Sequence, residues 1–99
     1  MTKAKRKVVL VRTFSAGVHV GELCARKGKE AVLANARRIW RWRGANTLNE
    51  VATIGIESAS GGWSRVSEPV AEVTLTEAIE VIPMTPTAVA SVQRCGWAK

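Results

Sequence analysis

The residues of this chain best suited to chemistry are four arginines and two tryptophans that fall within the seven residues 37–43. An arginine guanidinium presents a planar fork of donors that matches phosphate oxygens, and a tryptophan ring offers a flat apolar surface on which nucleobases stack. The segment therefore predicts contact with an anionic ligand that carries a base. A competing interpretation places the tryptophans in the core, because the chain has one phenylalanine and no tyrosine to supply aromatic bulk.

The distribution of charge points to the same kind of partner. The chain has 99 residues and a formal net charge of +7, yet residues 1–43 hold twelve basic and two acidic residues, and residues 44–99 are net acidic. Such an imbalance favours nucleic acid, a nucleotide or a membrane surface as partner, although a basic face can also serve solubility alone. The predicted ligand-binding residues are Lys3, Lys5, Arg6, Lys7, Arg37, Arg38, Trp40, Arg41, Trp42 and Arg43.

The sequence offers little for catalysis or metal binding. His19 is the only histidine and has no histidine or cysteine partner at metal spacing. The chain also has no glycine-rich phosphate loop, no nucleophile elbow and no paired acidic motif. Cys24 and Cys95 are too few and too far apart for a disulfide framework, so we expect two free, buried thiols in a reducing compartment. We predict a protein that is not an enzyme and has no catalytic residue, metal or cofactor.

Most of the elements that must position these residues are predicted strands. Residues 8–14 and 18–23 are rich in β-branched side chains and predict a hairpin, in which Gly21 indicates a bulge or a close backbone approach. Residues 30–43 are ambiguous, because residues 30–38 have helical propensity while residues 38–43 alternate like a strand. We favour the strand. It would place Arg38, Trp40 and Trp42 on one face, with Arg37, Ile39, Arg41 and Arg43 on the other.

Two short helices complete the predicted fold. Thr47 and Glu50 fit a capping box that begins a helix over about residues 47–55, and Thr85-Pro86 begins a second over about residues 86–95. Gly55 and Gly96 are the expected stops. The sequence thus predicts a basic arm over residues 1–7 and a single α+β domain over residues 8–99, with a mostly antiparallel sheet of five to six strands. The expected core residues are Val9, Val11, Val20, Leu33, Ile39, Trp40, Leu48, Val51, Val73, Leu75, Ile79, Val81 and Val89.

Several segments together resemble a known family. Residues 33–45 (LANARRIWRWRGA), the tripeptide at 47–49, residues 77–83 (EAIEVIP) and residues 9–21 (VLVRTFSAGVHVG) are similar to a family of small, uncharacterised proteins of tailed bacteriophages. The resemblance covers nearly the whole chain, and it supplies no catalytic residue. It implies a phage origin and action in the cytoplasm of the bacterial host.

Three kinds of ligand remain open for a basic phage protein without catalytic motifs. The first is nucleic acid, which suits the combination of a basic arm with an arginine- and tryptophan-rich strand. The second is a small nucleotide defence signal held in a pocket, and the third is a host protein or a virion component. No apolar run is long enough to cross a bilayer, so no membrane role is expected. Exposed sheet edges favour a homodimer or a higher homo-oligomer.

Overall fold

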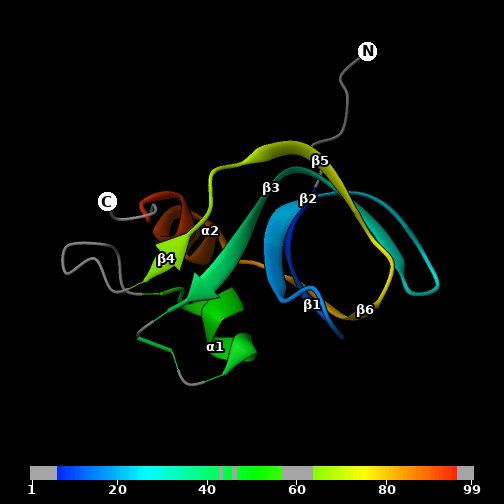
Figure 1. The fold of residues 1–99 in the computed structure, drawn as a ribbon. Coiled ribbons are helices and arrows are strands. Elements are labelled where there is room, and N and C mark those ends of the chain that lie inside the picture. Colours follow the sequence, from blue (N-terminus) through cyan, green and yellow to red (C-terminus); the bar gives the residue numbers. More distant parts are fainter. Residues whose placement is uncertain (1–6, 43, 46, 57–63, 96–99) are drawn as a thin grey trace, which may run out of the picture.

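The computed structural model describes residues 7–42, 44–45, 47–56 and 64–95. Within these ranges the chain forms six strands and two short helices (Figure 1): β1 (Val8–Thr13), β2 (Val18–Lys27), β3 (Glu30–Arg41), α1 (Leu48–Thr53), β4 (Arg65–Val66), β5 (Val70–Leu75), β6 (Ala78–Pro83) and α2 (Pro86–Gln93). The strand pairs are all antiparallel. The α+β fold class, the mostly antiparallel sheet and the choice of strand for residues 30–41 are therefore confirmed.

The sheet is curled, so that the strands at its two edges turn toward each other. The strand order is β4-β3-β2-β1-β6, and β5 pairs with the first half of β3 while β4 pairs with its end. Only Thr76 and Glu77 separate β5 from β6, so the strands that flank β3 and β1 are neighbours along the chain. The curled sheet thus has a concave inner face and an outer face.

A bulge opposite Gly21 helps to bend the long β2–β3 hairpin. Glu22 pairs with Ala34 and Val20 pairs with Arg37, so β3 carries an extra residue between these pairs. Asn35 lies there with a positive φ of 50°, and its side-chain amide donates to the Glu22 carboxylate. A Cβ on Gly21 would lie 3.0 Å from the Leu33 Cβ, so the backbones approach closely, as the sequence predicted. Bulges of this kind increase strand twist.

Each face of the sheet has its own apolar cluster. On the outer face, Leu10, Val20 and Ile39 pack against Val51 of α1 and Val92 of α2. The concave face is filled by a second cluster, whose buried members are Val9, Val11, Ala31, Leu33, Ala36, Leu75 and Ala78. Figure 1 shows both helices together on one side of the strands, away from the curl of β1, β2, β5 and β6.

The helix starts follow the predicted capping chemistry. The Thr47 hydroxyl accepts from the Glu50 amide at 3.2 Å, and the Thr85 hydroxyl accepts from the Ala88 amide at 3.1 Å. Gly55 follows α1 with a φ of +90°. A Cβ there would overlap the Ser91 hydroxyl of α2, so glycine is needed both for the turn and for the close contact of the helices. Gly96, the expected stop of α2, lies outside the described residues.

Three predicted burials are wrong, namely those of Trp40, Ile79 and Cys24. Trp40 is 57% exposed and Ile79 is 49% exposed. Ile79 falls between the Arg12–Glu80 and Thr13–Ala78 pairs, where a register shift leaves it without a cross-strand partner. Trp40 lies beyond the part of β3 that pairs with β5, so the inner cluster does not reach it. Cys24 is exposed, whereas Cys95 is buried, and neither forms a disulfide.

Candidate nucleic-acid interface

Arg37 and Arg38 are adjacent in sequence but point to opposite faces of β3. The side chain of Arg37 lies on the outer face under α2 and is 8% exposed. Its Nε donates to the Ser67 oxygen at 2.8 Å, Nη1 to Val92 O and Gln93 Oε1, and Nη2 to Cys95 O at 2.8 Å. These oxygens occupy all three guanidinium nitrogens. We therefore assign Arg37 a structural role, although the sequence placed it among the ligand-binding residues.

Arg38 is exposed on the concave face, beside the open end of the curl. Its Nε donates to Nε2 of His19 at 3.2 Å, across the β2–β3 pair. His19 is 3% exposed, and burial together with the positive charge of Arg38 lowers its pKa from 6.5 to about 4. The imidazole is therefore neutral at pH 7, which leaves Nε2 able to accept this bond. The lone histidine thus has a structural partner that the sequence did not reveal.

Trp40 lies two residues beyond Arg38, and the guanidinium groups of two further arginines lie near its ring. The Arg41 Cζ lies 5.0 Å from the ring centroid, and the Arg65 Cζ lies 5.9 Å from it. Both distances fall within the range of cation–π attraction. Arg41 pairs with Arg65 across β3 and β4, next to a register shift after Ile39, so the simple face alternation predicted for the strand ends there.

Trp42 differs from Trp40 in its surroundings. It is half-buried and packs against the outer cluster, and its Nε1 donates to the Ala45 oxygen at 3.1 Å. Of these two tryptophans, one therefore contributes to the core and the other to the surface. We call Arg38, Trp40, Arg41 and Arg65 the arginine–tryptophan surface, in which Arg38 and Trp40 are exposed and Arg41 and Arg65 are half-buried.

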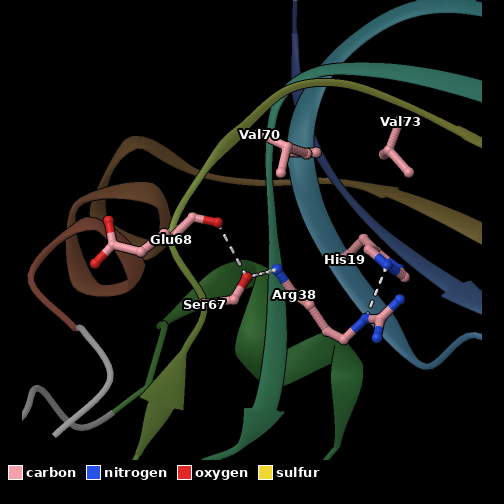
Figure 2. Close-up of a pocket in the computed structure, with 7 residues that line it drawn as sticks. His19, Arg38, Ser67, Glu68, Val70 and Val73 are labelled. Atoms are coloured by element: carbon pink, nitrogen blue, oxygen red, sulfur yellow. Dashed lines mark hydrogen bonds between the residues drawn. The ribbon is translucent and has the colours of Figure 1, made fainter. Parts of the chain in front are cut away.

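A cavity of about 250 Å³ adjoins this surface at the gap between β4 and β5. It is lined by His19, Ala36, Arg38, Ser67, Glu68, Val70 and Val73. Ser67 holds the rim of this cavity against β3, because its amide donates to Arg38 O and its hydroxyl accepts from Arg38 N, both at 2.8 Å. Figure 2 shows the Arg38 side chain reaching toward His19, while the Glu68 carboxylate points away from both.

The structure brings together only part of the predicted ligand-binding set. Arg38, Trp40 and Arg41 share one region, and Arg65, which is not in the predicted set, joins them. One signal could have found Arg65, because it is one of only three basic residues in the acidic half of the chain. Lys7 is exposed and precedes the first residue of β1. Trp40 lies beside the other end of β1, near the level of Arg12 and its pairing partner Val18. That separation is about 17 Å along the strand.

The remaining predicted residues, Lys3, Lys5, Arg6 and Arg43, lie outside the described residues. In the part of the chain that the structure describes, no group of three or more His, Cys, Asp or Glu side chains is placed to hold a metal ion. None of the helices in the same ranges is long and apolar enough to cross a membrane. The arrangement offers chemistry for binding an anion with an attached aromatic group.

Comparison with known proteins gives a family and no activity. A family model described as a domain of unknown function (DUF6948) matches residues 6–92. No curated protein and no solved structure matches the chain.

Proposed function

The chain belongs to this family of domains of unknown function, and we propose from its own geometry that it binds single-stranded nucleic acid without catalysing a reaction. The observation that carries the proposal is the exposed Trp40 ring flanked by the guanidinium groups of Arg41 and Arg65. The Trp40 ring stays exposed instead of adding buried apolar area to the core, and an exposed ring beside two cations suits a nucleobase attached to a phosphate chain.

Single strands fit this surface better than a duplex does. Stacking on Trp40 needs a base whose face is uncovered, and the bases of a duplex cover one another. The arginines can contact phosphates without reading the sequence, so we expect binding with little sequence preference. The predicted basic arm, Lys3, Lys5, Arg6 and Lys7, would add contacts on a longer strand, because Lys7 lies near the far end of β1 from Trp40.

The biological setting proposed with this function comes from the sequence resemblance. We place the protein in a tailed bacteriophage, acting in the cytoplasm of the bacterial host as a homodimer or higher homo-oligomer. The resemblance supports the phage origin, and the exposed apolar side chains Phe14 and Ile79 support self-association. A role against a host defence nucleotide, or on a host or virion protein, is the outcome to consider if nucleic acid does not bind.

The direct test is a titration of labelled single-stranded DNA and RNA, followed by fluorescence anisotropy at several salt concentrations. If the three arginines of the surface each neutralise a phosphate, the logarithm of affinity should fall with the logarithm of salt at a slope of about −2. A slope of roughly −3 to −5 would indicate that the basic arm also contacts phosphates. No binding at low salt would contradict the proposal, whereas tight binding of a mononucleotide that long DNA cannot displace would favour the pocket alternative.

Trp40→Ala against Trp42→Phe makes the test specific. Loss of the exposed ring should weaken binding by roughly 1–3 kcal/mol, as expected for one stacked base. Trp42→Phe should leave affinity unchanged, because Trp42 packs on the outer cluster. Equal effects of the two substitutions would show that the Trp40 ring is not the contact.

A further inference from the structure

We propose that the cavity beside Arg38 holds one phosphate group of the bound strand, with Arg38 as its ligand and His19 as the residue that positions Arg38. This inference rests on the proposed nucleic-acid binding and names a phosphate subsite within it. The cavity is lined by His19, Arg38, Ser67 and four further residues, and it opens beside the arginine–tryptophan surface. At about 250 Å³ it is smaller than the roughly 300–1,000 Å³ of pockets that enclose whole ligands, and so suits one group of a larger molecule.

Arg38 is fixed at three points before any ligand arrives. The main chain of Arg38 makes two hydrogen bonds to Ser67, one with its amide and one with its hydroxyl. The Arg38 Nε donates a third to His19 Nε2. The two terminal nitrogens, Nη1 and Nη2, make no hydrogen bond to any residue in the described ranges. A guanidinium held through Nε still presents its terminal nitrogens as donors, and oxygen anions accept such donors strongly.

His19 is an unusual support for an arginine, and its second nitrogen is the further sign of a site. Because Nε2 accepts from Arg38, the ring proton lies on Nδ1. Nδ1 is buried and has no hydrogen-bond partner among the described residues. An unpaired buried donor is costly, so its presence calls for a physical reason, and a binding role for the His19–Arg38 pair supplies one. A carboxylate in place of His19 would neutralise Arg38, whereas a neutral imidazole orients the guanidinium and leaves its full charge for a ligand.

The spacing connects this subsite to Trp40. Arg38 and Trp40 are two residues apart in β3, about 6.6 Å along a strand, so a nucleic-acid strand whose base stacks on Trp40 has a phosphate within reach of Arg38. The one carboxylate among the residues that line the cavity, that of Glu68, points away from Arg38 and His19 in Figure 2. The position therefore favours an anion over a cation.

The test compares variants in their affinity for a labelled single-stranded oligonucleotide at several salt concentrations. Arg38→Gln should lower affinity about tenfold and flatten the salt slope by about 0.7, the loss of one single-strand phosphate contact. Arg26→Gln is the matched control, since it removes the same charge from an exposed position near the far end of the β2–β3 hairpin. An Arg38→Gln slope equal to that of Arg26→Gln would overturn the subsite.

His19 is tested as a positioning residue by coupling. His19→Leu should weaken binding about three- to tenfold, because the Arg38 side chain must then be ordered by the ligand, and His19→Gln should restore most of the loss through its amide oxygen. In the Arg38→Gln background, His19→Leu should have no further effect on affinity. An equal loss in both backgrounds would show that His19 acts through folding alone, and thermal unfolding of each variant checks that the protein is folded when it is assayed.

The outcomes separate the two levels of the proposal. If the unchanged protein binds no oligonucleotide, both the proposed function and the subsite are wrong. If it binds, and Trp40→Ala weakens binding while Arg38→Gln matches its control, the function stands and the phosphate subsite is wrong.

Discussion

The guanidinium of Arg37 donates to the main-chain oxygen of Cys95 at 2.8 Å, joining β3 to the segment that follows α2. Together with the bonds to Val92 and Gln93, this contact holds the end of the helix against the sheet. Carbonyl oxygens at a helix C-terminus have no partner within the helix and carry partial negative charge. Arg37 of β3 therefore caps the C-terminus of α2, whereas Arg38 faces the solvent.

Arg37→Gln should destabilise the protein by about 3 kcal/mol, because buried carbonyl oxygens would lose charged donors. Urea denaturation measures the change. Arg38→Gln is the control and should cost less than about 1 kcal/mol, since Arg38 is exposed. A small effect at Arg37 would mean that the end of α2 does not depend on this cap.

Gly55→Ala should be among the most damaging single substitutions in the chain. The new Cβ would overlap the Ser91 hydroxyl and lie 2.8 Å from the Ser91 Cβ, in addition to the cost of a positive φ. We expect a loss of more than about 2 kcal/mol in the free energy of unfolding. Gly28→Ala isolates the backbone cost, because Gly28 also has a positive φ but nothing lies within 4 Å of its added Cβ, so it should cost only about 1 kcal/mol.

Stability should fall as the pH drops from 6.5 toward 4, and His19 is the reason. Burial, with the charge of Arg38, lowers the pKa of folded His19 to about 4, so in this window the unfolded chain binds the proton and the folded chain does not. The slope of stability against pH is therefore positive, and its full size is about 3 kcal/mol. His19 is the only histidine, so His19→Gln should remove most of the slope between about pH 5 and 6.5. An unchanged slope in urea denaturation of that variant would assign the effect to carboxylates.

Self-association should depend on the exposed apolar residues at one margin of the sheet. Phe14 is 80% exposed, and it lines a shallow hollow together with Ile79. Phe14→Ser should raise the concentration needed for dimer formation about tenfold in sedimentation experiments. Val70→Ser, which alters an exposed apolar residue elsewhere, should leave it unchanged. A monomer at tens of micromolar before any substitution would contradict the expected dimer.

Local patterns in the sequence predicted the type of most elements but not all of their ends, since the strand expected over residues 18–23 runs to Lys27. The alternation after Arg37 correctly placed Ile39 on a buried face, and the threonine caps correctly began both helices. These features depend on neighbours within a few residues. The candidate site is harder to predict than the secondary structure. Strand alternation places Arg37 and Arg38 on opposite faces, but it does not show which of these faces α2 covers.

Long-range contacts account for what was missed. Trp40 was expected in the core because aromatic residues are scarce, but β5 stops pairing with β3 at Ala36, and the inner cluster ends before Trp40. Arg65 reaches the same ring from 25 residues further along the chain, through the two-residue strand β4. No pattern within one segment encodes that meeting.

The two apolar clusters have a consequence for how the molecule opens. Val9, Leu10 and Val11 are successive residues of β1, all at most 1% exposed, and they alternate between the inner and the outer cluster. Separating β1 from its neighbours would therefore expose both clusters at once. The amides of β1 should then exchange with solvent deuterium only through global unfolding, while those near the ends of α1 exchange through smaller local openings.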